Sequence, residues 1–376
     1  MSKYTLRGSA ELDAKIDTDL NRISEAVRGS RFGSLYRALI LIGGYGRGEG
    51  TPFIVKGKQV PFNDYDLVVV SKSLSCRQRT EVQSDLRHWE VTLSSELNLP
   101  VDLCLYPDNV FCQAEFSLLN YEMKYGHLVV WGEPDIVRHM PDYQHHLIPL
   151  SEGTRLLMNR GKLLLDVRRA LRDKTSFTDE ERIRYIKFLF KALLAFGDCT
   201  LLVYADYDLR YSVKKERILK YLNADMPDPE FMVEGYRRAV EYKEWGDFQS
   251  LAPEAWREEF DRIRRYYVRF IQWYEGRRLA ADVSTPAGYL AALVVSGREC
   301  GVGKALLLNL RLFGYRAFAC RAGFLGLHPR ARLYMALPLL LGDSSPSEQL
   351  QGLLSSVSGQ REAIESQFYR LQKRIS

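Results

Sequence analysis

The chain has 376 residues, of which 46% are hydrophobic and 27% are charged, and its formal net charge is +6. This length suggests two or three domains, and the apolar content is ample for buried cores that need no disulfide staples. The six cysteines form no Cys-x-x-Cys pair and have no histidine at metal-ligand spacing, which argues against a cysteine metal site and favours reduced thiols. The first residues lack an apolar signal core and no apolar run reaches about 18 residues, so we expect a soluble cytoplasmic protein with no membrane partner.

Charge is divided unevenly along the chain. Residues 1–150 contain 16 Lys and Arg against 19 Asp and Glu, whereas the remainder contains 37 against 28. The first part is therefore mildly acidic and the second part basic. A basic surface would attract phosphate-bearing substrates, although a charge excess spread over long helices is more often a solvated face. We expect no DNA partner.

The first elements lead into a glycine-rich turn. Apolar residues at helical spacing predict a helix over about 11–28, and the run Ala38–Ile42 predicts a buried strand. The stretch Gly43–Gly50 leaves this strand as a turn that brings backbone N–H groups close to a polyanion. No helix opens after Gly50, so the glycines do not fit the dinucleotide-binding fingerprint. Residues 53–62 alternate around a Lys-Gly-Lys turn and predict an inserted hairpin whose ends come together.

Three carboxylates follow on predicted strands. Asp64 and Asp66 enter a strand at 67–70, and residues at i and i+2 of a strand point the same way. Asp102 lies near the start of another strand at 100–106, after a helix over about 77–97. Three carboxylates on adjacent strands can hold two Mg²⁺ or Mn²⁺ ions about 3.5–4 Å apart, the arrangement used for in-line nucleotidyl transfer. Asp108, in a nearby loop, is the alternative to Asp102 as the third carboxylate.

The rest of the chain is mainly helical. A helix at 111–125 and a last strand at 126–132 bring the α/β part to an end near Pro141. Apolar spacing then predicts helices near 151–173, 178–205, 212–223, 228–243, 254–278 and 285–297. The leucine-rich run 333–341 indicates a buried helix, and Ser345 and Pro346 suit a helix start ahead of a final segment that ends at about Arg374. The predicted class is α+β, with domains 1–141 and 150–376, the second all-α.

The glycine turn and the acidic residues resemble the signature of nucleotidyltransferases of the DNA polymerase β superfamily. That signature is an apolar residue with Gly-Gly at a turn, then Asp-x-Asp entering a strand, then a third acid on a later strand. Ile42-Gly43-Gly44, Asp64-Tyr65-Asp66 and Val101-Asp102-Leu103 occupy these places. The turn is most similar to that of bacterial protein uridylyltransferases. The resemblance covers about residues 30–135, and the hairpin makes the spacer between turn and Asp-x-Asp longer than is usual.

The resemblance implies a mixed sheet with flanking helices and an enzyme that moves a nucleoside monophosphate from a nucleoside triphosphate, such as ATP, to a hydroxyl. The acceptor is a protein side chain, a small molecule or an RNA end, and pyrophosphate leaves. Gly43 and Gly44 would let backbone amides reach the phosphates, and Arg47 would pair with the triphosphate through its planar fork. A C-terminal helical domain in such proteins helps to bind nucleotide or acceptor as a clamp. Lys191 and Lys215 are its candidate nucleotide-binding residues.

Two other functions fit parts of the sequence. One is a nucleotide-sensing or regulatory module that kept the fold without turnover, against which the three intact carboxylates argue. The other is an RNA-processing helical module, because Arg321 and His328 stand in a loose spacing known from some helical ribonucleases.

Overall fold

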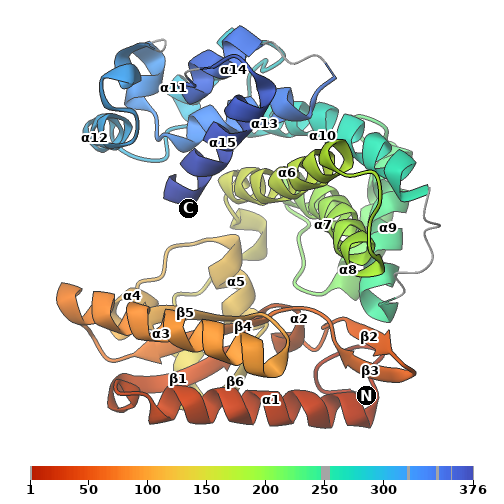
Figure 1. Ribbon diagram of the computed structural model, residues 1–376, viewed down its shortest axis with the longest axis vertical. Coiled ribbons are helices and arrows are strands. Elements are labelled where there is room, and N and C mark those ends of the chain that lie inside the picture. Colours follow the sequence, from red (N-terminus) through yellow and green to blue (C-terminus); the bar gives the residue numbers. More distant parts are fainter. Residues whose placement is uncertain (1, 247–254, 320–321, 344–346, 357, 376) are drawn as a thin grey trace. The chain divides into compact units, whose positions relative to one another are not determined.

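The computed structural model describes residues 2–246, 255–319, 322–343, 347–356 and 358–375 (Figure 1). The chain forms two compact units. The first contains Met1–Pro149, Ala205–Leu219 and Arg237–Phe248, and the second contains Leu150–Tyr204, Lys220–Tyr236 and Gln249–Ser376. Two later segments thus belong to the first unit, a long-range association that apolar spacing does not encode. In the described part of the chain, no helix is both long and apolar enough to cross a bilayer.

The first unit is built on a mixed four-stranded sheet. Its strands are β1 (Tyr36–Leu41), β4 (Tyr65–Ser71), β5 (Val101–Pro107) and β6 (Leu128–Gly132). They lie in the order β5-β4-β1-β6, with β1 antiparallel to both neighbours and β4 parallel to β5. This sheet and the many helices confirm the predicted α+β class.

Two helices cover one face of the sheet. They are α1 (Ala10–Gly29), capped by Ser9, and α3 (Cys76–Leu97), which begins with a capping box between Ser75 and Gln78. Their buried side chains share one core with alternate strand residues such as Leu67 of β4 and Leu103 of β5. Because side chains alternate across a strand, the residues between these positions project from the opposite face.

The hairpin expected at 53–62 is confirmed. Strands β2 (Pro52–Val55) and β3 (Lys58–Pro61) pair antiparallel, and Lys56 and Gly57 take positive φ at the turn between them. The Tyr45 hydroxyl joins the two ends: it donates to the Thr51 carbonyl and accepts from the backbone N–H of Phe62 and Asn63. The insertion therefore leaves the glycine turn and the Asp pair close together.

The glycine turn contains one helical turn, α2 (Gly43–Gly46). The single helix predicted over 111–125 is wrong, because the structure has α4 (Asp108–Phe111) and α5 (Leu118–Tyr125) instead. Ser117 explains the break, since its side chain accepts from Asn120 N–H and starts a new helix.

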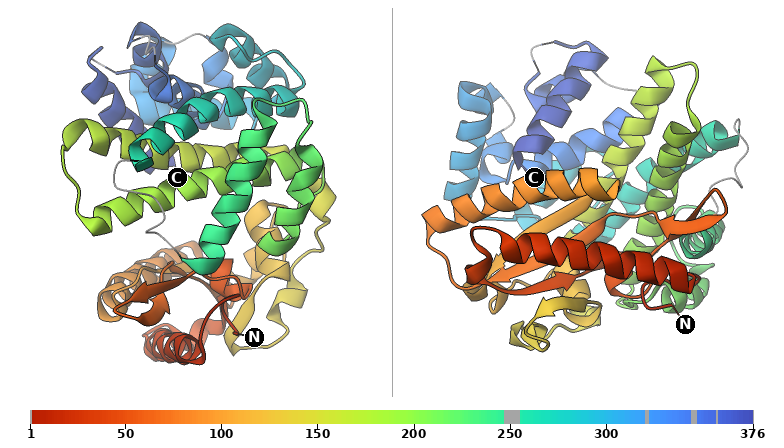
Figure 2. Two further views of the ribbon diagram at one scale, coloured as in Figure 1. Left: turned by 90° about the vertical axis from the view of Figure 1, so that its right-hand side faces the viewer. Right: turned by 60° about the horizontal axis from the view of Figure 1, so that its bottom comes forward.

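The second unit is helical. Helices α6, α7 and α10 pack side by side (Figures 1 and 2). The remaining helices of the chain include α8 and α9 as well as the C-terminal series. Their bounds are α6 (Leu150–Asp173), α7 (Asp179–Val203), α8 (Tyr211–Arg217), α9 (Pro229–Trp245), α10 (Ala255–Leu279), α11 (Pro286–Ser296), α12 (Val302–Phe313), α13 (Arg330–Leu341), α14 (Ser347–Leu354) and α15 (Arg361–Ile375). Short 3₁₀ turns are η1 (Gly33–Leu35), η2 (Ile136–His139), η3 (His145–Leu147), η4 (Ile218–Tyr221), η5 (Gly314–Ala319) and η6 (Ala322–Gly326).

The last segment differs from the sequence prediction. It forms two helices, α14 and α15, where one helix was expected, and the proposed start at Ser345 and Pro346 lies outside the described residues. The leucine-rich run lies in α13, whose side chains are mostly buried as predicted.

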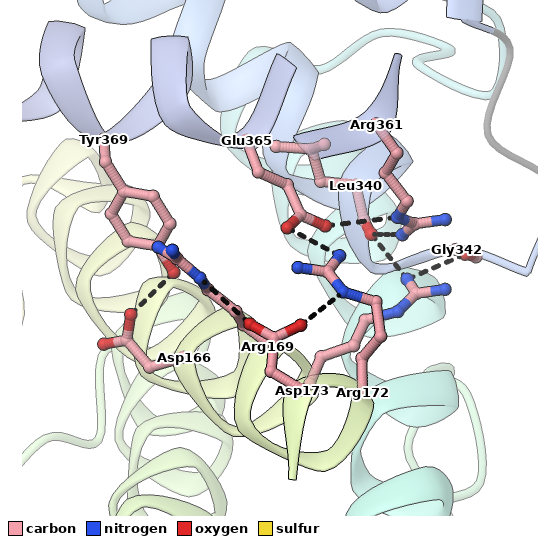
Figure 3. A network of polar contacts seen from close by, with 10 residues as sticks. Asp166, Arg169, Arg172, Asp173, Leu340, Gly342, Arg361, Glu365 and Tyr369 are labelled. Carbon is pink, nitrogen blue, oxygen red and sulfur yellow. Dashed lines mark hydrogen bonds and ion pairs between the residues drawn. The ribbon is translucent and has the colours of Figure 1, made fainter. Parts of the chain in front are cut away.

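Guanidinium groups hold the end of α13 (Figure 3). Arg361 donates to the Leu340 carbonyl at 2.7 Å and Arg168 to the Gly342 carbonyl at 3.1 Å, so carbonyls that a helix C-terminus leaves unpaired are satisfied. Arg172 of α6 joins Glu365 of α15 at 2.9 Å. Burial, together with the nearby Arg361 and Arg264, lowers the pKa of Arg168 to about 10. These contacts tie α6, α13 and α15 into one body.

Candidate metal centre

The three predicted carboxylates meet at one point of the first unit. Asp64, Asp66 and Asp102 each offer an oxygen atom, and these three atoms lie within 4.8 Å of one another. Asp66 and Asp102 are direct neighbours across the parallel pair β4 and β5, and Asp64 stands one residue before β4. Asp64 and Asp66 are half-buried and Asp102 is exposed. Carboxylate oxygens at this spacing are the ligands that Mg²⁺ and Mn²⁺ prefer, so the residues fit a divalent cation.

Tyr65 sets the direction in which the Asp pair points. Its side chain is fully buried beneath the sheet, where its hydroxyl donates to Asp19 of α1 at 2.9 Å. Its backbone N–H donates to the Pro100 carbonyl, which brings the beginnings of β4 and β5 together. Burial, reinforced by Asp19, raises the pKa of the Tyr65 phenol, so it stays a neutral donor. With Tyr65 anchored on the core face, Asp64 and Asp66 project from the other face.

The carboxylate that lies with Asp64 and Asp66 is Asp102 rather than Asp108. Asp108 forms an ion pair of 2.6 Å with Nη1 of Arg37, whose Nη2 also contacts Glu133 at 2.6 Å. Asp108 begins α4, at the opposite end of β5 from Asp102. Of the two alternatives that the sequence leaves open, Asp102 is the one whose carboxylate lies beside Asp64 and Asp66.

The glycine turn lies against this cluster. Gly43 has φ +67°, and a Cβ atom added to it would lie 2.6 Å from Oδ2 of Asp66. Its backbone thus needs glycine both for its dihedral angle and for its closeness to the carboxylate. Ile42 N–H donates to the Asp66 carbonyl at 2.9 Å, which fixes the turn beside β4. The structure places Gly43 against the carboxylate of Asp66, with Gly44 next to it in the turn.

Arg47 has other partners than the expected triphosphate. Its side chain is only 6% exposed, and Nη1 contacts Glu122 of α5 at 2.9 Å. Gly126 allows this packing, since a Cβ atom there would lie 2.5 Å from Cγ of Arg47. Burial acts to lower the pKa of Arg47, but Glu122 and the nearby Tyr211, Tyr207 and Glu49 together outweigh it, and the net shift is upward. For Glu122, burial acts to raise the pKa, but the charges of Arg47 and Lys214, together with the hydrogen bonds from Tyr207 and Arg47, give a net lowering.

Glu49 and Glu122 hold the segment 205–219 on the glycine turn. The backbone N–H of Tyr211 donates to Glu49 at 3.0 Å, and the hydroxyl of Tyr207 donates to Glu122. Lys214 is fully buried, with its ammonium 4.0 Å from the centre of the Tyr211 ring. The acidic residues around the turn therefore order the turn and α8.

Lys243 is a site residue that sequence reasoning missed. A Cβ atom added to Gly44 would lie 3.1 Å from Nζ of Lys243, so this ammonium stands directly beside the glycine turn. The same Nζ lies 5.3 Å from the centre of the Tyr211 ring. Lys243 sits near the end of α9 among acidic neighbours, and no local pattern marks it. Only the fold brings it to the turn.

The other candidates are placed less favourably. Lys215 belongs to the first unit but pairs with Glu241 at 2.8 Å. Lys191 lies on α7 in the second unit. Arg321 lies outside the described residues. His328 accepts from Arg330 N–H through Nδ1, and burial lowers the pKa of its imidazole.

Comparisons with protein-family models, with curated proteins and with solved structures find no match to this chain. The geometry of the site is therefore what supports a functional proposal.

Proposed function

We propose that the chain is a metal-dependent nucleotidyltransferase that moves a nucleoside monophosphate from a nucleoside triphosphate to a hydroxyl-bearing acceptor. The observation that carries the proposal is the set of three carboxylates on β4 and β5, with oxygens within 4.8 Å of one another. The glycine turn against Asp66 and the ammonium of Lys243 beside Gly44 supply a phosphate-binding side to the same cluster. Three clustered carboxylates without these neighbours would be much weaker support for nucleotidyl transfer.

Each residue has a task in this mechanism. Asp64, Asp66 and Asp102 would hold Mg²⁺ or Mn²⁺, which neutralises phosphate charge and makes the acceptor hydroxyl more acidic. Gly43 and Gly44 allow close approach of the phosphates, and Lys243 contributes a positive charge there. Arg47, which belongs to the turn, forms an ion pair with Glu122 of α5 and so holds the turn in place. Tyr65 positions Asp64 and Asp66.

The transfer itself is an in-line displacement. The oxygen of the acceptor hydroxyl forms a bond to the α-phosphorus, and the bond from that phosphorus to the oxygen bridging to the β-phosphate breaks. Pyrophosphate leaves with the electron pair of the broken bond. The hydroxyl proton moves to the Asp102 carboxylate, which is the most exposed of the three and passes it to water.

The test is label transfer with matched variants. The purified chain, incubated with each α-³²P nucleoside triphosphate, Mg²⁺ or Mn²⁺ and a panel of hydroxyl acceptors, should move label from the α-phosphate and none from the γ-phosphate. Asp66→Asn and Asp102→Asn should abolish transfer, and Mn²⁺ binding by electron paramagnetic resonance should fall with it. Asp108→Asn is the matched control, since Asp108 pairs with Arg37 instead. Full transfer by Asp66→Asn would refute the proposal, and Mn²⁺-dependent nucleotide binding with no transfer to any acceptor would identify a sensing module.

A further inference from the structure

A cavity of about 840 Å³ runs along the open edge of β5, beginning at Asp102. β5 is the outermost strand of the sheet, and its alternate residues Asp102, Cys104 and Tyr106 share one face and line the cavity. All residues that line it belong to the first unit. This volume is in the range of small-molecule sites, which is about 300–1,000 Å³.

A polar stripe of α3 forms another part of the lining. Arg79, Gln83 and Arg87 are spaced four residues apart, so they lie on one side of the helix and line the cavity. Across the part of the chain that the structure describes, neither guanidinium forms a hydrogen bond or an ion pair. Asn109 and Gln113 add amide groups to the lining. The cavity thus offers two unpaired cations and several neutral hydrogen-bonding groups, and the carboxylates of Asp102, Glu90 and Glu115 also line it.

The two ends of the cavity differ in chemistry. Ser94 Oγ accepts from Val101 N–H and Glu90 Oε1 accepts from Leu103 N–H, so α3 runs antiparallel to β5. Earlier residues of α3 therefore lie further along β5, away from Asp102. About 16 Å of helix separate Glu90 from Arg79 at the usual rise per residue. One end of the cavity holds the carboxylate of the metal centre, and the arginines follow along its length.

The same two hydrogen bonds argue against an extended peptide as the ligand. A peptide that adds to a sheet edge needs the outward N–H groups of the edge strand. At β5 the side chains of Ser94 and Glu90 already accept from two of them. A compact ligand remains the better fit to the cavity.

We propose that this cavity binds the acceptor, and that the acceptor is a small hydroxyl-bearing molecule that also carries an anionic group, a phosphate or a carboxylate. Its hydroxyl lies at Asp102 and supplies the attacking oxygen, and its anionic group is held by Arg79 and Arg87. Guanidinium groups suit both anions because they donate two parallel hydrogen bonds. The role of the bound molecule as the acceptor rests on the proposed nucleotidyl transfer. Binding of such a molecule to the cavity does not depend on that proposal.

The exposed thiol of Cys104 reports on occupancy of the cavity. Alkylation by N-ethylmaleimide, followed by peptide mass spectrometry, measures its rate in the full chain without nucleotide or metal. Millimolar glucose 6-phosphate or glucuronate should slow Cys104 alkylation at least threefold, while glucose should not. The exposed Cys112, which does not line the cavity, is the internal control. The more protective of the two anions distinguishes a phosphate-bearing from a carboxylate-bearing acceptor.

The Arg79→Gln/Arg87→Gln variant completes the test. Both arginines are exposed and unpaired, so the variant should fold and melt as the wild type does, and it should lose the protection. Unprotected Cys104 in the wild type with both anions, or equal protection in the double variant, would overturn the proposal. Protection without label transfer would leave the site standing and count against the nucleotidyltransferase. Label transfer to an acceptor that leaves Cys104 unprotected would support the nucleotidyltransferase and count against this cavity as the acceptor site.

Discussion

Asp66 of β4 lies directly beside Asp102 of β5, because the two strands are parallel and in register at these positions. Two carboxylates that share one place repel each other when both are ionised. The hydrogen bonds of Tyr65 to Asp19 and to the Pro100 carbonyl keep β4 in place and so hold the two carboxylates together despite this repulsion. A divalent cation between the carboxylates would relieve it, and this expectation leads to measurements that need no substrate.

Mn²⁺ or Mg²⁺ should raise the melting temperature of the wild type. A ligand that binds only the folded state adds about 2.7 kcal/mol at one hundred times its dissociation constant. Asp66→Asn should abolish most of this rise, and without metal it should be at least as stable as the wild type because one repulsive charge is gone. Scanning calorimetry with EDTA and with Mn²⁺ measures both. An equal metal-induced shift in both proteins would place the cation elsewhere.

Gly43→Ala should disturb the same centre through the backbone. The substitution imposes a side chain at φ +67° and puts its Cβ atom 2.6 Å from Oδ2 of Asp66. We expect a loss of roughly 1–3 kcal/mol in the free energy of unfolding and weaker Mn²⁺ binding. Gly57→Ala is the control, since Gly57 has φ +77° but no atom within 4 Å of the added Cβ. Gly57→Ala should lower stability without changing Mn²⁺ affinity. Equal Mn²⁺ affinity in the Gly43→Ala and Gly57→Ala variants would therefore contradict the proposed contact.

Lys243→Met should weaken nucleotide binding. The ammonium beside Gly44 is expected to contact phosphate, and hydrogen bonds to charged groups contribute about 1.5–3 kcal/mol. Calorimetric titration of a non-hydrolysable triphosphate in Mg²⁺ should then show a dissociation constant raised more than tenfold. Lys215→Met, which removes a cation paired with Glu241, should change it by less than threefold. The opposite ranking would exchange the roles of the two lysines.

The parts of this site that the sequence predicts are those with local signals. Asp64 and Asp66 flank the start of a strand. The hairpin is marked by its own turn at Lys56 and Gly57, and all of it lies within ten residues of sequence. Lys243 and the segment around Tyr211 are different, because only tertiary contacts bring them to the glycine turn. The sequence predicts that Arg47 binds the triphosphate, because its planar, forked donor group suits phosphate oxygens. The local sequence does not predict its burial against Glu122, because Glu122 belongs to α5, which lies far along the chain. Local pattern therefore predicts the carboxylates well and their neighbours poorly.

Glu122→Gln should destabilise the first unit strongly. Arg47 would keep its charge in a buried place with only the more distant Glu49, 3.8 Å from its Nε, as a counter-charge, and removing one partner of a buried ion pair costs about 3–5 kcal/mol. The pH dependence follows from the lowered pKa of Glu122 in the folded state. Its contribution to stability is present above the unfolded pKa of 4.5 and is lost as pH falls through the lower folded value. Urea unfolding from pH 7 to pH 4 should show a smaller acid loss in the variant than in the wild type.

Cys104→Trp should separate acceptor use from nucleotide binding. The thiol lies in the cavity between Asp102 and Tyr106, and an indole there would fill space that the proposed acceptor needs. Metal-induced stabilisation and triphosphate affinity should stay within threefold of the wild type, because the Asp64 and Gly43 side of the centre is untouched. Transfer to the acceptor should fall at least tenfold. Cys112→Trp places the same bulk on an exposed position outside the cavity and should keep full transfer. If Cys104→Trp transfers label as well as Cys112→Trp does, the acceptor approaches Asp102 from another side.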